Sequence, residues 1–166
     1  MDEIDYKILD LLQHDAAISV ADIADQVGLS PTPCWRRMQK LEQSGVITGR
    51  VALLNPDLVG AGFTVFVSVE VGDHSAAWLG RFADGVTAMP EVVGLHRMAG
   101  DIDYLVHVVV PDIAAFDAFY KRLIAIAPLK NVTSRFAMER LKSTTALPLN
   151  PSFFRDRRGF DDAPRG

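Results

Sequence analysis

One short segment near the N-terminus places basic side chains and an apolar stripe at helical spacing. Cys34, Met38 and Leu41 follow one another at intervals of four and three residues, so in a helix they share one face. Arg36 and Lys40, four residues apart, point the other way. A rod that is anchored on one side and basic on the other fits the DNA major groove, where such side chains bind guanine edges or phosphates. The pattern predicts a DNA-reading helix.

This helix has a start signal of its own. Ser30 is a preferred N-cap residue, and Pro31 suits the first helical position. Hydroxyl groups at a helix N-terminus lie where free backbone N–H groups also bind phosphate. The predicted DNA-binding residues are Ser30, Thr32, Arg36, Arg37, Gln39, Lys40 and Arg50. A solvated charged face without a ligand is the alternative interpretation.

The neighbouring elements indicate a winged helix-turn-helix. A first helix starts near Asp2, and a Ser-x-x-Asp signal at 19–22 starts a second helix, which Gly28 ends. Only a short turn then precedes the reading helix, as in the DNA-binding bihelical motif. Residues 46–47 and 50–54 are expected to pair as a two-stranded wing.

The remainder of the chain alternates strands and helices. Strands are expected over 63–71, 92–98, 103–110 and 131–141, and helices over 75–88 and 112–126. The order β-α-β-β-α-β is that of a ferredoxin-like unit. The predicted fold class is therefore α+β, with a winged helix-turn-helix (1–54), a linker (55–62), a ferredoxin-like βαββαβ domain (63–148) and a mobile tail (149–166).

The composition is compatible with a DNA partner only because of where the basic residues lie along the chain. The formal net charge of the 166 residues is −4, but up to residue 50 every basic residue except Lys7 lies between Arg36 and Arg50. A single cysteine predicts no disulfide framework and a reducing compartment. Since no apolar run approaches the ~18 residues of a membrane span, the sequence predicts a cytoplasmic protein without a membrane partner.

Cys34 has two interpretations. A lone thiol beside basic residues invites a redox role, whereas its helical neighbours Met38 and Leu41 predict burial in the helix-turn-helix core. An apolar setting raises the pKa of a thiol and makes it unreactive. The structural interpretation is the one we expect.

Catalytic chemistry has no support in the sequence. His14, His74, His96 and His107 are dispersed and lack metal-ligand spacing. No segment matches a nucleophile elbow, a phosphate loop or a zinc-protease helix. We therefore expect a protein that is not an enzyme and that has no catalytic residues, no metal site and no cofactor.

The segment Gly100-Asp101-Ile102-Asp103-Tyr104 joins two predicted strands. It is suited to a plain hairpin, for which Gly and Asp are common turn residues. It is also suited to an amino acid, because backbone N–H groups freed by Gly can hold a carboxylate and an Asp can hold an ammonium.

Several motifs, in order, carry a family resemblance. They are residues 29–34, Gly45-Val46-Ile47, 52–56, 100–104, Val110-Pro111-Asp112 and Met138-Glu139. With them the chain resembles the Lrp/AsnC (leucine-responsive, feast/famine) family of transcription regulators. The resemblance implies double-stranded DNA as a partner and a C-terminal domain that senses a small amino acid. It also implies homodimers paired through their sheets, which assemble into tetramers or octamers.

The resemblance further implies an effector pocket. Its residues would be Met98, Ala99, Gly100, Asp101, Asp103, Tyr104, Thr133, Ser134 and Phe136. Within the family, residues 32–35, 74–75, 89–92, 97–100 and 134–138 resemble the branch that senses L-cysteine and activates cysteine-degrading enzymes, although Leu95-His96 and the tail after Pro148 depart from it. Two other functions stay open: an effector-independent, nucleoid-like DNA binder, and a small-molecule enzyme built on the ferredoxin-like domain.

Overall fold

The computed structural model describes residues 1–150, which form two compact units. Of the described residues, the first unit contains Met1–Ala52 and residues 142–150, and the second contains Leu53–Leu141. Residues 142–148, which the sequence analysis assigns to the ferredoxin-like domain, thus group with the first unit. From residue 151 on, the predicted tail lies outside the described residues. No helix within residues 1–150 is long and apolar enough to cross a membrane.

Three helices form the first unit: α1 (Glu3–His14), α2 (Val20–Val27) and α3 (Pro31–Gln43). The side chains of Asp2 and Asp5 each accept a bond from the other's backbone N–H, which closes a capping box at α1. The Ser19 hydroxyl caps α2, as predicted. Gly28 ends α2 at φ 70°, a left-handed conformation that glycine adopts without strain.

The core of the first unit is a small apolar cluster contributed by all three helices. Its buried members are Ile8, Leu9, Leu12, Ile23, Ala24, Cys34, Met38 and Leu41. The apolar stripe predicted on α3 is therefore confirmed as its inward face. Cys34 is fully buried, and this burial raises the pKa of its thiol. The structure agrees with a packing role for Cys34.

The two strands predicted for the wing, at 46–47 and 50–54, do not form within the described residues. Residues 46–54 contain no strand, and Val51, Leu53 and Leu54 are between 70% and 79% exposed. A two-stranded hairpin is marginal unless its apolar side chains pack against something. Here those side chains lie in solvent, so pairing has nothing to stabilise it.

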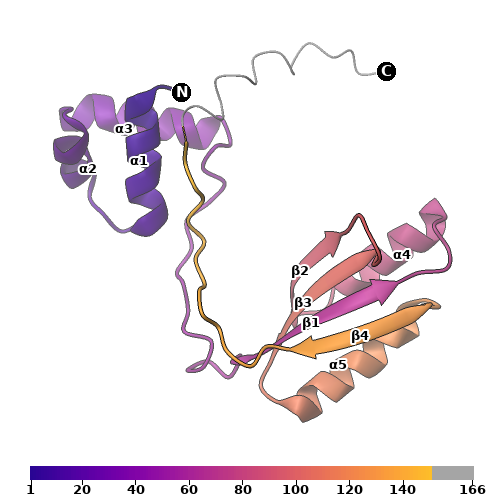
Figure 1. Ribbon diagram of the computed structural model, residues 1–166. Coiled ribbons are helices and arrows are strands. Elements are labelled where there is room, and N and C mark those ends of the chain that lie inside the picture. The colour runs from indigo at the N-terminus through magenta and orange to yellow at the C-terminus, as the bar shows by residue number, and fades with distance from the viewer. Residues whose placement is uncertain (151–166) are drawn as a thin grey trace. The chain divides into compact units, whose positions relative to one another are not determined.

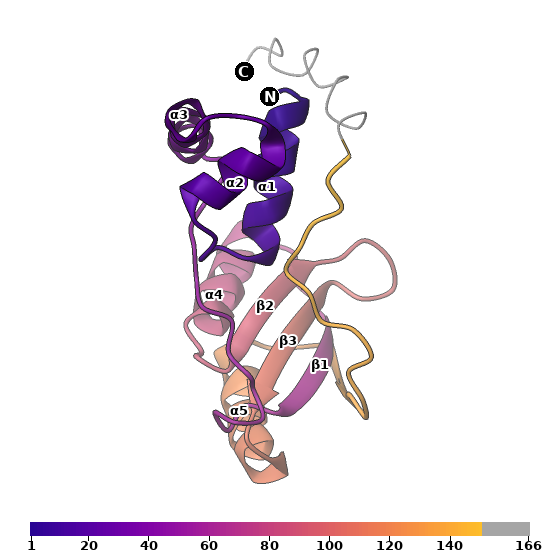
Figure 2. The ribbon, with the colours of Figure 1, turned by 90° about the vertical axis from the view of Figure 1, so that its left-hand side faces the viewer.

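The second unit is a four-stranded antiparallel sheet with two helices. Its strands are β1 (Phe63–Glu70), β2 (Val92–Arg97), β3 (Tyr104–Val110) and β4 (Asn131–Phe136), and its helices are α4 (Ala76–Thr87) and α5 (Ile113–Ile126). The sheet order β2-β3-β1-β4 and the β-α-β-β-α-β sequence confirm the ferredoxin-like prediction. Both helices lie along one face of the sheet (Figures 1 and 2).

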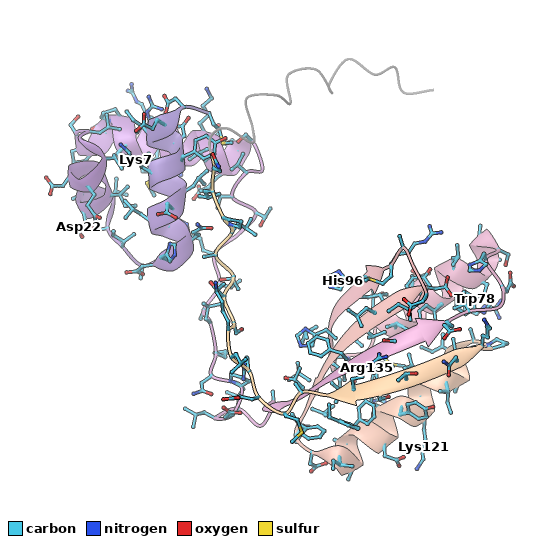
Figure 3. All side chains as sticks on the ribbon, viewed as in Figure 1. Lys7, Asp22, Trp78, His96, Lys121 and Arg135 are labelled. Atoms are coloured by element: carbon cyan, nitrogen blue, oxygen red, sulfur yellow. The ribbon has the colours of Figure 1, made fainter. Side chains whose placement is uncertain are left out.

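Alternation along the strands sorts their side chains between the two faces of the sheet. In β1, Val65, Val67 and Val69 are fully buried against the helices, whereas Phe66 is 37% exposed on the opposite face. β3 shows the same period of two. We call the face that α4 and α5 leave uncovered the open sheet face. In Figure 3, His96 projects from β2 on this side, while Lys121 projects from α5 away from the sheet.

β4 is shorter than predicted. It ends at Phe136 rather than near residue 141. β4 pairs only with β1, and its last partners, Val65 opposite Phe136 and Thr64 bonded to Ala137, lie where β1 begins. The pairing of β4 with β1 ends at that row, so the residues that follow Phe136 do not continue the strand.

Candidate DNA-binding and effector sites

The outward face of α3 carries cations that are free to bind a ligand. Arg36 and Lys40 are both exposed, and neither makes an ion pair or a side-chain hydrogen bond among the described residues. The exposed Thr32 belongs to the same side of the helix, opposite Cys34 and Met38. The helix is therefore anchored by one stripe and presents unsatisfied donors on the other.

Ser30 holds the N-cap position of α3 but does not cap it with its side chain. Its backbone is extended, with φ −80° and ψ 158°, and its hydroxyl makes no bond to the N–H groups of the first turn. The prolines at 31 and 33 remove two of those N–H groups. The exposed Ser30 hydroxyl remains available to a phosphate, although the side-chain cap that the sequence predicts is absent.

Arg37 is held within the first unit. Its guanidinium donates to a carboxylate oxygen of Asp2 and to one of Asp5, both at 2.7 Å. These bonds, the one to Asp5 first, raise the pKa of Arg37. The pKa of Asp2 is lowered, chiefly by the backbone N–H of Asp5 and then by Arg37. Arg37 thus ties α3 to the start of α1, a role that the sequence analysis did not foresee.

Gln39 and Arg50 share one acceptor. Gln39 donates to Glu42 at 3.1 Å, and Arg50 donates to the other oxygen of the same carboxylate at 2.7 Å. Arg50 is thereby held beside the C-terminal half of α3. Of the predicted DNA-binding cations, only Arg36 and Lys40 are unpaired within the described residues.

Trp35 is an exposed aromatic residue that the sequence analysis did not place in the site. It follows Cys34 on α3, and 51% of its surface is accessible. A large apolar side chain left in solvent next to Arg36 is suited to contact with a sugar or a thymine methyl group. The sequence carried a signal for this exposure, because Trp35 lies outside the stripe formed by Cys34, Met38 and Leu41.

The predicted effector loop is a hairpin between β2 and β3. The N–H of Met98 donates to the carbonyl of Asp103 at 2.8 Å, which closes the loop. Gly100 has φ 138°, a backbone conformation that residues other than glycine rarely adopt. Met98, Ala99, Gly100 and Asp101 are all exposed. The loop therefore presents backbone groups and the Asp101 carboxylate to solvent.

Two hydrogen bonds tie Asp103 to the end of β1 and the residue after it. One carboxylate oxygen, Oδ2, accepts from the N–H of Val71 at 2.8 Å, and the backbone N–H of Asp103 donates to the carbonyl of Val69. The other oxygen, Oδ1, lies 4.0 Å from Nδ1 of His74. The side chain is 34% exposed. Oδ1 is thus the oxygen that remains for an ammonium group, and it is held in a defined place.

The other predicted effector residues lie on both faces of the sheet. Tyr104 is buried, with its ring 5.0 Å from that of Phe82. Ser134 and Phe136 pair with Val67 and Val65 and so belong to the helix-covered face. Thr133 lies between them in sequence, is exposed, and belongs to the open sheet face.

A single chain does not gather these residues into one pocket. Tyr104 and Val132 both pair with Val69, so they lie in one row across the sheet. Phe136 is four residues further along β4, which is roughly 13 Å at strand spacing. The hairpin and the far end of β4 therefore belong to different parts of the surface of the second unit.

A shallow hollow of about 240 Å³ opens at the same edge of the sheet as the hairpin. Its lining residues are Gly72, Asp73, Trp78, Pro128, Leu129 and Lys130. The indole Nε1–H of Trp78 is buried and has no acceptor among the described residues. Lys130 pairs with Glu70 at 3.3 Å. The hollow did not figure in the sequence analysis, since its residues come from three separate segments.

The open sheet face carries aromatic and basic side chains. The rings of Phe66 and His107 stack with centroids 4.8 Å apart, and Arg135 donates to the buried Ser68 hydroxyl at 2.6 Å. Burial lowers the pKa of His107, and the nearby His96 and Arg140 lower it further. His107 is consequently neutral at neutral pH, so that this face keeps an apolar centre.

Residues 1–150 contain no group of three His, Cys, Asp or Glu side chains that could hold a metal ion. The described residues offer groups suited to recognition: cations on α3, and a hairpin with a fixed carboxylate where β2 and β3 meet.

Comparison with known proteins matches both units. Residues 1–48 match a winged helix-turn-helix DNA-binding family, and residues 64–147 match the Lrp/AsnC ligand binding domain. The chain is 49% identical over 150 residues to the DNA-binding transcriptional activator DecR of Escherichia coli, covering 90% of this chain and 99% of that protein. It is 47% identical over 149 residues to the glutamate uptake regulatory protein of Zymomonas mobilis, covering 90% and 91%.

Solved structures of transcription regulators are also similar to this chain. An AsnC family transcriptional regulator from Agrobacterium tumefaciens superposes with a TM-score of 0.87 at 58% identity, covering 89% of this chain and 97% of that one. A transcriptional regulator from Neisseria meningitidis, solved in complex with L-Met, gives a TM-score of 0.86 at 33% identity, covering 90% and 97%. The relatives named here are transcription regulators, not enzymes.

Proposed function

Because this chain belongs to the Lrp/AsnC family of DNA-binding transcription regulators with an amino-acid-binding domain, we propose a specific division of labour. The first unit binds operator DNA through α3, and the second unit binds a small amino acid that modulates the binding. The protein acts in the cytoplasm, on chromosomal double-stranded DNA, and needs no cofactor.

The observation that best supports DNA binding is that the cations on and just after α3 differ in whether they are paired. Arg37 and Arg50 are paired within the first unit, whereas Arg36 and Lys40 are exposed and unpaired among the described residues. An unpaired, fully hydrated cation loses little on moving to a phosphate or a guanine edge. We therefore assign base or phosphate contact to Arg36 and Lys40, with support from Thr32, Ser30 and Trp35.

The proposed effector site is built on the hairpin between β2 and β3. Asp103 Oδ1 would receive the ammonium group, and the backbone N–H groups around Gly100 would receive the carboxylate. Since one chain does not bring β4 residues to this hairpin, we propose that a second copy completes the pocket. Thr133, Ser134 and Phe136 would then be contributed across that interface.

L-cysteine is our first candidate effector, on the residues that resemble the cysteine-sensing branch. The names of the relatives point to other amino acids for those proteins: glutamate uptake in one case and an L-Met complex in another. Glutamate, methionine and leucine are therefore the next ligands to test.

A homodimer paired through the open sheet face is part of the proposal. That face carries the stacked Phe66 and His107 rings and no covering helix. Pairing of two such faces would bury the apolar centre, and further assembly into tetramers or octamers would place several DNA-binding units side by side. Sedimentation of the full chain tests this, since a monomer at micromolar concentration contradicts it.

An effector-independent, nucleoid-like DNA binder is the second candidate. It is favoured by the self-contained hairpin, in which Asp103 already accepts a bond from Val71. The two candidates differ in ligand binding and in sequence preference.

One experiment separates them. Genome-wide mapping of bound DNA, with and without cysteine, glutamate, methionine and leucine, reports targets, specificity and effector together. Discrete sites whose occupancy changes with one amino acid support the proposal. Uniform coverage that no amino acid alters would assign the protein to the architectural class.

A further inference from the structure

The chain returns to the first unit after completing the sheet. Residues 142–150, which we call the strap, belong to the same compact unit as α1, α2 and α3 (Figure 2, yellow-orange). None of the motifs that carried the family resemblance in the sequence, and no predicted site residue, lies in this segment. Its contacts with α1 nevertheless are specific, and they involve a side chain to which the sequence analysis gave no role.

Gln13 forms the polar part of the contact. Its amide Nε2–H donates to the carbonyl of Leu147 at 3.0 Å, and its Oε1 accepts from the N–H of Leu147 at 2.8 Å. One side-chain amide thus satisfies both backbone groups of one residue, as a neighbouring strand would. A further bond from Nε2 to Asp10, at 3.1 Å, holds the amide in this orientation.

Leu149 forms the apolar part. It is half-buried and packs against the core cluster of the first unit, beside a groove lined by Tyr6, Leu11 and Val27. Other leucines of this part of the chain do not pack: Leu147 is 69% exposed and Leu141 is 87% exposed. The Leu147 backbone and the Leu149 side chain therefore both hold the strap against the first unit.

We propose that the face of α1 bearing Gln13 is a docking surface for the strap, and that the docked strap is a second tether between the two units. The chain already crosses from the first unit to the second at Ala52. Docking anchors the second crossing, after Leu141, to a helix of the DNA-binding unit. Residues 137–146 then connect β4 directly to α1.

This arrangement gives effector binding a route to the DNA-binding helices, and in this respect the inference rests on the proposed function. Thr133, Ser134 and Phe136 of β4 are proposed effector residues, and the strap is the chain that follows them. Ligand binding at β4 would thereby act on the segment that leads to the docked strap. The two hydrogen bonds between Gln13 and Leu147 each make a modest net contribution to stability, so a ligand-driven change can release this contact.

Hydrogen–deuterium exchange on the full chain tests the docking itself. In the wild type, the amide of Leu147 should exchange about tenfold or more slowly than in an unstructured peptide, because it donates to Gln13. Gln13→Ala and Leu149→Ser should each remove most of this protection. Matched controls are Leu141→Ser, at an exposed leucine, and Asp25→Ala, at an exposed residue of α2.

Two results would overturn the docking. One is unprotected exchange at Leu147 in the wild type. The other is protection that survives both Gln13→Ala and Leu149→Ser. Protection that rises with protein concentration would assign the surface to the strap of a second copy, and the intrachain tether would then be wrong.

The tether is tested by the effector response. In the Gln13→Ala/Leu149→Ser variant, operator affinity without amino acid should stay within about twofold of wild type, because neither residue lies on α3. The amino acid should still bind with unchanged affinity, but its effect on operator affinity should shrink severalfold. A full response in a variant whose strap is unprotected refutes the tether. Absence of amino-acid binding in the wild type refutes the proposed function and leaves the exchange result to decide the docking.

Discussion

The outward face of α3 and the hairpin between β2 and β3 are both proposed recognition sites, but they differ in how much of their chemistry the fold already uses. On α3, Arg36 and Lys40 have no partner within the described residues, while the apolar stripe behind them is buried. In the hairpin, Asp103 is bonded to Val71 and Tyr104 is part of the core. DNA offers its own phosphates and bases, so free cations on a rigid helix suffice. A small zwitterion needs an enclosure, and residues 1–150 of one chain do not bring the predicted β4 residues to the hairpin to form it.

The largest effect is expected at the hairpin. Asp103→Asn keeps an oxygen for the N–H of Val71 but removes the charge proposed to hold the ammonium group. Loss of one partner of a charged pair in a closed site costs about 2–5 kcal/mol. Calorimetry should therefore show amino-acid affinity reduced at least about thirtyfold. Asp101→Asn, at an exposed position, is the control, and equal losses in both variants would contradict the special role of Asp103.

On α3, the double variant Arg36→Ala/Lys40→Ala should lose about 1–3 kcal/mol of operator binding for each base contact removed. The measurement is a titration of operator and random DNA at several salt concentrations. A side chain that meets only phosphate should weaken both DNAs alike and lower the salt dependence. Unchanged affinity in the folded double variant would remove α3 from the DNA interface.

Arg37→Ala compares a paired cation of α3 with the unpaired Arg36 of the same helix. Because its guanidinium bonds to Asp2 and Asp5, the variant should lose about 1 kcal/mol of stability, measured by urea unfolding. Operator affinity of the folded fraction should change less than in Arg36→Ala. If Arg37→Ala reduces the free energy of operator binding by more than it reduces the free energy of unfolding, the guanidinium must leave its carboxylates to contact DNA.

Cys34→Ala should cost roughly 1 kcal/mol of stability, as expected for a small buried group. The effector response should persist. Burial raises the pKa of this thiol, so alkylating reagents should modify it only as fast as the first unit opens. Rapid labelling of the native protein, with oxidant-dependent DNA binding, would restore the redox interpretation.

The smallest effect concerns His107 on the open sheet face. Its pKa is lowered in the folded state, so the unfolded chain takes up the proton first as the pH falls. Stability should decrease from about pH 6.5 downwards, until the folded histidine is protonated as well. His107→Phe keeps a ring beside Phe66 and should flatten this decrease in urea unfolding at pH 7.5 and 5.5. His14→Phe, at an exposed histidine of the first unit, is the control.

Much of this protein follows from its sequence because the decisive signals are local. Helix caps at Asp2 and Ser19, the left-handed Gly28, the stripe of Cys34, Met38 and Leu41, and the alternation of β1 and β3 each depend on residues a few positions apart. These signals determined the α+β class and the order of the elements, and they identified the helix that carries the cations.

The tertiary structure decided which of the predicted side chains remain available. Arg37 forms an ion pair with Asp5 of α1, and Arg50 forms one with Glu42. Gln13 forms hydrogen bonds with Leu147, which lies 134 residues further along the chain. The end of β4 and the absence of the two predicted wing strands also depend on surfaces elsewhere in the molecule, since a strand persists only where another strand or a core lies against it. Pairings of this kind are set by packing, which spacing in a single sequence does not encode.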